Sequence, residues 1–321
     1  MNTKKILIIL SEPNSIFSEI LFKYFKSVNF KKNKKYITLV GCKKLIQKQM
    51  DYLGYKLNLN EIFNIDAALP RLINIINVDY KFNKVFSNIS NSSNSYIEKC
   101  FDISIKILKK DKSIALINGP ISKKHFLKKK FPGVTEYIAN KIGSKDPVML
   151  IYNKNLSVSP LTTHVPLKKV SKFIKKKRII SKILKIDVFF KNRLRKSPNI
   201  AVLGLNPHCE TTDKVSEEEK EIIPAINYLK SKKVKVSGPI SADTFFLKKN
   251  IKEFDVVVGM YHDQVLTPIK TLFKFDAINV TIGLPFVKVT PDHGPNEEMI
   301  GKNKSDPSSI FFALDFLNKL K

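Results

Sequence analysis

The sequence predicts an α/β protein with a mainly parallel sheet that helices cover on both faces. Short apolar runs rich in β-branched residues recur along the chain, and longer stretches of helical period separate them. Runs that are apolar throughout, rather than alternating, are typical of strands buried on both faces. The chain has 321 residues, of which 43% are hydrophobic, so it is long enough for two subdomains with sizeable cores.

The expected strands are spread over the whole chain. Each is a run of three to five residues, mostly apolar and β-branched. The clearest helical periods lie at 168–194 and 217–229. The expected strands are 6–10, 37–40, 114–117, 148–151, 200–203, 234–236, 256–258 and 278–281.

The net charge of +29 raises the question of nucleic-acid binding, because clustered Lys and Arg attract phosphates. The lysines occur in short runs scattered along the chain, such as 128–130, 175–177 and 232–233, without a basic tail or a zinc-finger spacing. Abundant Lys, Asn and Ile are typical of an AT-rich genome. We therefore interpret the charge as solvated surface that also helps to attract an anionic substrate.

Composition also predicts the compartment. No apolar run approaches the ~20 residues of a membrane span, and the run 6–10 is too short for the core of a signal peptide. Cys42, Cys100 and Cys209 are few and widely spaced, which argues against a disulfide framework and for a reducing environment. We expect a cytoplasmic protein that does not bind membranes.

Polar residues follow several of the expected strands, where ligands of parallel sheets bind. Four of the five histidines lie in such segments, namely His164, His208, His262 and His293. A single loop histidine is more often a hydrogen-bonded structural residue than a ligand. Several at the ends of strands in one sheet indicate a divalent-metal site, because neutral imidazoles bind Zn²⁺ and similar ions. Asp243 and Asp263 are candidates for a base or for orienting a histidine.

A second group of side chains is suited to an anion. Lys270, Asn279 and Lys288 are expected to follow His262 on consecutive loops, and Thr135 lies in the segment PGVTE. Amines, an amide and a hydroxyl are the donors that a phosphate requires. Because lysine is abundant throughout this chain, solvated surface is the competing interpretation for both lysines.

Together these segments resemble one family. The motifs NGPISK, PGVTEYI, TTHVPL, GLNPHC, GPISADTFF, YHDQVLTPIK and NVTIGLPFVKVTPDHG occur in the order found in 4-hydroxythreonine-4-phosphate dehydrogenases of vitamin B6 synthesis. The resemblance is clearest from Ile114 to His293 and extends weakly over the whole chain.

The resemblance implies an α/β/α architecture like that of isocitrate and isopropylmalate dehydrogenases, with two subdomains that flank a cleft. We expect these subdomains at approximately 1–130 plus 285–321, and at 131–284. It also implies a homodimer with the active site at its interface. By the same resemblance His164, His208 and His262 bind the metal, and the residues that bind the substrate are Thr135, Lys270, Asn279 and Lys288.

The implied reaction is the NAD-dependent oxidation of the 3-hydroxyl of 4-phosphooxy-L-threonine, followed by decarboxylation to 3-amino-1-hydroxyacetone phosphate. NADP remains possible as the oxidant, and Zn, Mg or Co as the metal. A base must take the hydroxyl proton, and Asp243, Asp263 and Lys270 are candidates among which the sequence does not choose. The chain has no G-x-G-x-x-G segment, and the family has none either.

The chain departs from the family pattern at four places. Val134 stands where the family has a substrate-binding histidine, and Lys288 replaces an arginine, which loses the bidentate fork. The segment CETTDKVSEEE lacks the glycines of the family loop, and SEPNSIFSE replaces a glycine-rich turn near the start. Ser15 and Phe17 are expected to introduce strain there, since glycines permit positive φ.

These departures keep other functions open. One is a paralogous dehydrogenase of another phosphorylated hydroxy acid, such as a phospho-threonate or a phospho-erythronate. A metal-dependent hydrolase or lyase would need no NAD, because a metal bound by three histidines also generates hydroxide. A relative that has lost its substrate and a basic nucleic-acid-binding protein are the remaining alternatives.

Overall fold

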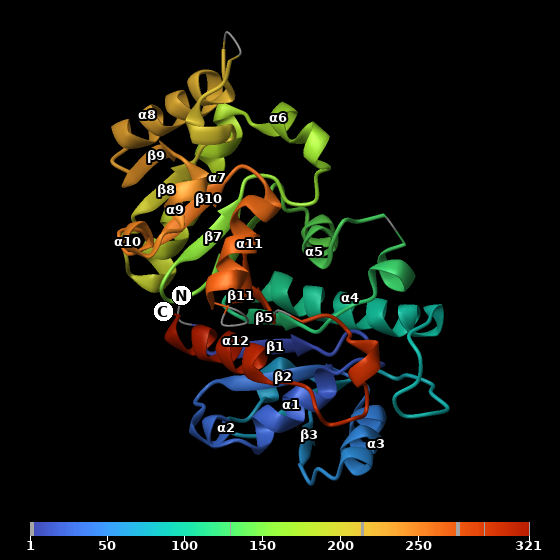
Figure 1. Cartoon of the computed structure of the whole chain (residues 1–321). Helices are drawn as coiled ribbons and strands as arrows, with labels where there is room; N and C mark the ends of the chain where they lie inside the picture. Colours follow the sequence, from blue (N-terminus) through green and yellow to red (C-terminus); the bar gives the residue numbers. More distant parts are fainter. Residues whose placement is uncertain (1–2, 129, 213–214, 274–276, 292, 321) are drawn as a thin grey trace. The chain divides into compact units, whose positions relative to one another are not determined.

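The computed structural model describes residues 3–128, 130–212, 215–273, 277–291 and 293–320 (Figure 1). The chain divides into two compact units. Unit 1 comprises Met1–Pro147 and Leu284–Leu320, and unit 2 comprises Val148–Gly283. Over the described residues, we find no helix with the length and apolar character needed to cross a membrane.

Unit 1 contains a parallel sheet. Its strands lie in the order β3-β4-β2-β1-β5-β12, and every pairing between them is parallel. The central strand β1 is buried along nearly its whole length, as the unbroken apolar run ILII after Lys5 requires. The strands are β1 (Lys5–Ile9), β2 (Tyr36–Gly41), β3 (Leu59–Glu61), β4 (Ile73–Asn77), β5 (Ala115–Asn118) and β12 (Lys288–Thr290).

The helices of unit 1 bury apolar faces against this sheet and against one another. In α4 the buried side chains recur every three or four residues, from Tyr96 to Leu108, and the helix packs on β1 and β2. Helix α1 instead packs with α2, α3 and α12 (Figure 1). The helices are α1 (Phe17–Lys26), α2 (Val28–Lys32), α3 (Lys43–Leu53), α4 (Asn94–Lys110), α5 (Val134–Ile142) and α12 (Ser308–Lys319), with the short turns η1 (Ile65–Ala67), η2 (Asn91–Ser93), η3 (Lys123–Leu127) and η8 (Glu297–Met299).

Unit 2 contains a mixed sheet. Its strands lie in the order β11-β6-β7-β10-β8-β9; β6 runs antiparallel to both of its neighbours, and the pairings from β7 to β9 are parallel. The carboxyl ends of β7, β10 and β8 therefore lie at one edge of the sheet. The strands are β6 (Val148–Tyr152), β7 (Ser157–Pro160), β8 (Ile200–Leu203), β9 (Val236–Ile240), β10 (Val256–Gly259) and β11 (Ile278–Ile282).

The helices of unit 2 complete its core. Helix α11 packs on β7 and β10, and α7 packs against α8. The helices are α6 (Val170–Phe173), α7 (Lys176–Phe189), α8 (Ile223–Ser231), α9 (Ala242–Phe245), α10 (Lys248–Ile251) and α11 (His262–Phe273), with the short turns η4 (Leu167–Lys169), η5 (Phe190–Leu194), η6 (Pro207–Cys209) and η7 (Glu218–Ile222).

The structure confirms most of the expected elements and corrects several. The strand expected at 234–236 begins only at Val236, because the N–H of Val234 still caps the preceding helix through the carbonyl of Leu229. The helical stretch 168–194 is broken, since Ile174 and Lys175 are extended. Four strands were not expected: β3, β4, β7 and β12.

Candidate active site

Three of the histidines follow three neighbouring strands of unit 2. His164 lies after β7, His262 after β10 and His208 after β8, and β10 pairs with both of the other strands. Both pairings are parallel, so the three segments leave the sheet at the same edge. The segment that carries His164 does not follow β6, as expected from the sequence, but the unexpected strand β7.

Hydrogen bonds connect these loops to one another. The hydroxyl of Thr162 donates to the carbonyl of Met260 at 2.8 Å, which joins the loop of His164 to that of His262. Gln264 accepts the N–H of Met260 at 2.6 Å and donates to the carbonyl of Gly204 at 2.8 Å, which joins the loops after β10 and β8. The loops of His164 and His208 and the start of α11, where His262 lies, therefore form one connected layer at the edge of the sheet.

Within this layer two of the three imidazoles, those of His262 and His208, have carboxylate neighbours. The rings of His164 and His262 have centroids 6.4 Å apart. Nδ1 of His262 lies 2.6 Å from Oδ1 of Asp263, and Nδ1 of His208 lies 3.8 Å from Oδ2 of Asp243. A hydrogen bond from the hydroxyl of Ser241 lowers the pKa of Asp243, and His208 lowers it further.

These donors fit a divalent ion in their chemistry. A carboxylate at Nδ1 fixes the ring and leaves Nε2 as a metal ligand, which is the usual arrangement of metal-binding histidines. Because a Zn–N bond is about 2.1 Å long, two imidazoles on one ion have centroids roughly 5–6 Å apart, close to the separation of His164 and His262. Over the described residues, no group of three or more His, Cys, Asp or Glu side chains is gathered closely enough to hold a metal. The three-histidine site therefore stays a prediction.

Lys270, Asp263 and Asn279 also belong to unit 2. Lys270 lies on α11 rather than in a loop, seven residues after Asp263, so both exposed side chains share one face of the helix about 10 Å apart. Asn279 lies on β11 and its Oδ1 is buried without a hydrogen-bond partner in the described structure. A buried acceptor of this kind is costly unless a ligand donates to it.

Thr135 and Lys288 come together in unit 1. Lys288 lies on β12, not in a loop as the sequence suggested, and is fully buried. Its ammonium lies 3.3 Å from the hydroxyl of Thr135 and 2.6 Å from that of Thr290, which in turn donates to Asn118. Burial lowers the pKa of Lys288 to about 7, although the charge of Glu136 acts in the opposite direction.

The departures from the family pattern have clear structural consequences. The strained residue of the first turn is Ser11, with φ of 57°, whereas the positive-φ residues identified in the described chain do not include Ser15 or Phe17. The expected strain at these two residues was therefore wrong. The ring of Phe17 instead packs so closely on Gly119 that a Cβ there would lie 2.4 Å from it. Val134 packs against the core of unit 1.

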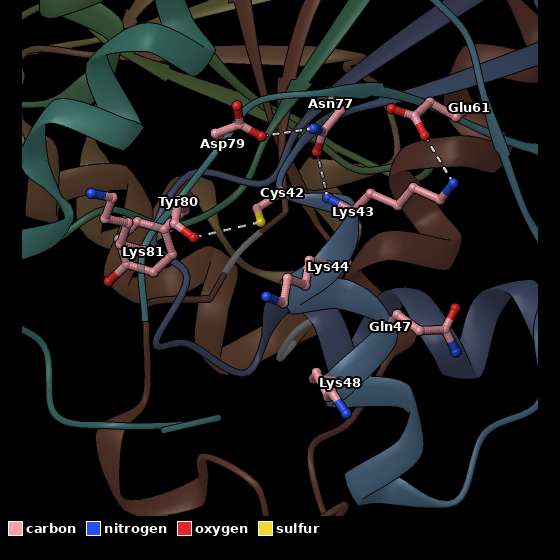
Figure 2. Close-up of a pocket in the computed structure, with 10 residues that line it drawn as sticks. All are labelled: Cys42, Lys43, Lys44, Gln47, Lys48, Glu61, Asn77, Asp79, Tyr80 and Lys81. Carbon is pink, nitrogen blue, oxygen red and sulfur yellow. Dashed lines mark hydrogen bonds and ion pairs between the residues drawn. The ribbon is translucent and has the colours of Figure 1, made fainter. Parts of the chain in front are cut away.

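A separate cavity of about 430 Å³ lies in unit 1 at the ends of β2 and β4. Figure 2 shows that its polar groups bind one another: Asn77 accepts the backbone N–H of Lys43 at 2.9 Å and donates to Asp79 at 3.0 Å. The ammonium of Lys43 pairs with Glu61 at 2.8 Å. No described residue of the predicted site lines this cavity.

Sequence reasoning missed three residues of these regions. Gln264 lies in the quoted motif YHDQ but was given no role. Glu218 is buried beneath the His208 loop, yet it stands in an acidic run that suggests a solvated helix start. Glu12 is buried in the first turn, and burial raises its pKa to about 7 against hydrogen bonds from Asn14 and Ser93. No sequence signal distinguishes these buried acids from exposed ones.

Comparison with known proteins identifies close relatives. Residues 33–317 match the family model described as pyridoxal phosphate biosynthetic protein PdxA. A 4-hydroxythreonine-4-phosphate dehydrogenase from Sulfurihydrogenibium sp. (strain YO3AOP1) is 38% identical over 99% of this chain and 98% of that protein. A D-threonate 4-phosphate dehydrogenase from Pectobacterium atrosepticum is 34% identical over 64% of both chains.

Solved structures agree with these relatives. The crystal structure of a 4-hydroxythreonine-4-phosphate dehydrogenase from Klebsiella pneumoniae has a TM-score of 0.83 at 26% identity and covers 98% of both chains. A beta-decarboxylating dehydrogenase from Thermococcus kodakarensis has a TM-score of 0.50 at 11% identity, over 98% of this chain and 83% of that one, which is a likeness of fold alone. The predicted fold class is thereby confirmed.

Proposed function

Because the chain belongs to the PdxA family of pyridoxal phosphate biosynthetic proteins, as its motifs predicted, we propose that it is a 4-hydroxythreonine-4-phosphate dehydrogenase. It oxidises the 3-hydroxyl of 4-phosphooxy-L-threonine with NAD, and the product loses carbon dioxide to give 3-amino-1-hydroxyacetone phosphate. The observation that carries this proposal is the placement of His164, His208 and His262 after three neighbouring parallel strands.

The residues of unit 2 supply the chemistry at the hydroxyl. A divalent ion bound by the three imidazoles would polarise the substrate oxygen and lower the pKa of its proton. Asp263 orients His262 through the 2.6 Å contact at Nδ1. The hydroxyl proton passes to a base, for which Asp243, Asp263 and Lys270 remain the candidates. The buried Oδ1 of Asn279 accepts a hydrogen bond from the substrate.

By the family resemblance, Thr135 and Lys288 would supply donors for the phosphate. Thr135 and Lys288 are in contact, and Lys288 loses its proton readily because it is buried. A dianionic phosphate beside this amine favours its charged form, so binding of the phosphate would also bind a proton. Lysine provides a point charge here rather than the planar fork of an arginine.

The remaining features follow from the family. We propose NAD as the oxidant, with NADP as the alternative, and Zn²⁺, Mg²⁺ or Co²⁺ as the metal. The protein acts as a cytoplasmic homodimer with its active site at the interface. The exposed side chains of His164 and His208 are accessible to a second chain or to a ligand.

The assay is the formation of reduced nicotinamide from NAD, 4-phosphooxy-L-threonine and a divalent metal. His208→Ala and His262→Ala abolish turnover, because each removes one imidazole of the site. His125→Ala, outside the predicted site, serves as the matched control and retains turnover. Metal-replete wild-type protein that forms no reduced nicotinamide with either NAD or NADP would remove the assignment.

A second candidate is a dehydrogenase of another phosphorylated hydroxy acid. Val134 favours it, because this side chain can neither donate a hydrogen bond nor carry charge, and a relative 34% identical is a D-threonate 4-phosphate dehydrogenase. A panel of phosphorylated hydroxy acids, including phospho-threonate and phospho-erythronate, separates the two enzymes by the ratio of their kcat/KM values. Metal-dependent turnover of a substrate without NAD would instead indicate a hydrolase or a lyase.

A further inference from the structure

The loop that carries His208 is held in a strained conformation. His208 has φ of 55° and ψ of 15°, and Cys209 has φ of 63°. Both residues have positive φ, and neither is glycine, so both are strained. Two consecutive strained residues persist only where surrounding contacts impose them.

Glu218 provides these contacts from the start of η7. Its Oε1 accepts the backbone N–H of Leu205 at 2.7 Å and that of Asn206 at 2.9 Å. Its Oε2 accepts the side-chain amide of Asn206 at 2.8 Å. One carboxylate thus binds three donors of the segment that leads into His208.

Burial and charge make these contacts strong. Glu218 is 1% exposed, and burial by itself would raise its pKa, but the hydrogen bonds from Asn206 and Leu205 lower the pKa below its ordinary value. The group is therefore a carboxylate at neutral pH. Hydrogen bonds to a charged acceptor are stronger than those to a neutral one, and three of them offset the strain of the loop.

The loop that Glu218 holds is also joined to the start of helix α11. Gly204 lies directly beneath it: a Cβ at this position would lie 2.7 Å from Sγ of Cys209 and 3.1 Å from Oε1 of Glu218. The carbonyl of Gly204 accepts from Gln264, two residues after His262. The contacts of Glu218 therefore set where His208 stands relative to the loop of His262.

We propose that Glu218 is a positioning residue that fixes His208 for metal binding, an inference that rests on the proposed function. A histidine held in place before the ion arrives pays its ordering entropy during folding rather than during binding. Groups that orient metal ligands typically change metal affinity by 10- to 100-fold when they are removed.

The test is isothermal titration of Zn²⁺ or Co²⁺ into the metal-free full chain. Glu218→Gln keeps the shape of the side chain but removes its charge and one acceptor, and it should weaken metal binding by about 10-fold. Glu219→Gln is the matched control in the same turn η7, since Glu219 is exposed and its carboxylate accepts the N–H of Ser216 rather than a donor of the His208 segment. Turnover of Glu218→Gln should recover at saturating metal, which an unfolded variant would not show.

Each result of the metal titration supports or refutes a specific part of this proposal. Wild-type protein without metal affinity would overturn the proposed function itself. Wild-type and Glu218→Gln proteins with equal affinity would overturn the positioning role alone. Should Glu218→Gln not fold, Asn206→Ala removes one of the three bonds while Glu218 stays; a several-fold loss of metal affinity supports the role, and an unchanged affinity refutes it.

Discussion

Glu12 makes the stability of the protein depend on pH in a predictable direction. The side chain is 2% exposed and follows the central strand β1. Its carboxyl accepts the N–H of Asn14 at 3.1 Å and the hydroxyl of Ser93 at 3.2 Å. Burial raises its pKa from 4.5 to about 7, against these hydrogen bonds, and the charge of Glu297 raises it further.

The size of this pH dependence follows from the linkage between proton binding by Glu12 and unfolding. Between pH 4.5 and about pH 7 the folded chain keeps the proton that the unfolded chain has lost, so the free energy of unfolding falls as pH rises through this window. Each pKa unit corresponds to about 1.4 kcal/mol, so above pH 7 the whole shift lowers the free energy of unfolding by roughly 3 kcal/mol. Glu12→Gln removes the titration while the amide oxygen can still accept the N–H of Asn14.

Urea unfolding at pH 5 and pH 8 measures the effect. Glu12→Gln should have nearly the same free energy of unfolding as wild type at pH 5 and be more stable by about 2–3 kcal/mol at pH 8. Glu253→Gln, at an exposed position, should change neither value. A Glu12→Gln variant with the same difference from wild type at both pH values would show that this carboxyl is ionised in the folded protein.

Three further predictions concern other buried contacts. The pKa of Lys288 is about 7 in the folded chain, below its ordinary 10.5, so the free energy of unfolding of the wild type rises with pH between these values. In urea titrations, Lys288→Met should therefore be stabilised relative to wild type by more at pH 7 than at pH 10. Gly119→Ala should lower the free energy of unfolding by about 1–3 kcal/mol, because its Cβ meets the ring of Phe17, and Phe17→Leu should restore part of it in thermal melts. Gln264→Met should lower kcat by about 10-fold, because it removes the hydrogen bonds that join the segments of His262 and His208. The control Gln47→Met, at an exposed position, should leave kcat unchanged, and equal kcat values for the two variants would contradict this role of Gln264.

The strands that sequence predicted best are those whose own residues supply the burial. β8 has the bounds expected for it, because IAVL is apolar throughout. β7 reads SVSP and β12 reads KVT, and neither has enough apolar character to be distinguished from a loop. Their strand conformation comes from pairing with neighbours that lie far away in the sequence.

In the candidate site, too, only the features that depend on local sequence could be predicted. The position of the histidines at one edge of the sheet was predictable, because a polar residue that follows a parallel strand lies at the carboxyl edge, whereas their metal binding stays a prediction. The acids that hold the loops were not, because Glu218 becomes a buried ligand of N–H groups only after the loop from β8 turns back onto η7. Likewise, nothing local shows that Lys288 contacts Thr135, more than a hundred residues away.

The most direct measurement of the central claim is an anomalous difference map from a crystal of the protein grown with zinc. The account predicts one ion per chain, with ring nitrogens of His164, His208 and His262 about 2.1 Å away, whichever chain of a dimer supplies each of them. An ion held by other side chains, or well-ordered histidines without an ion, would contradict it.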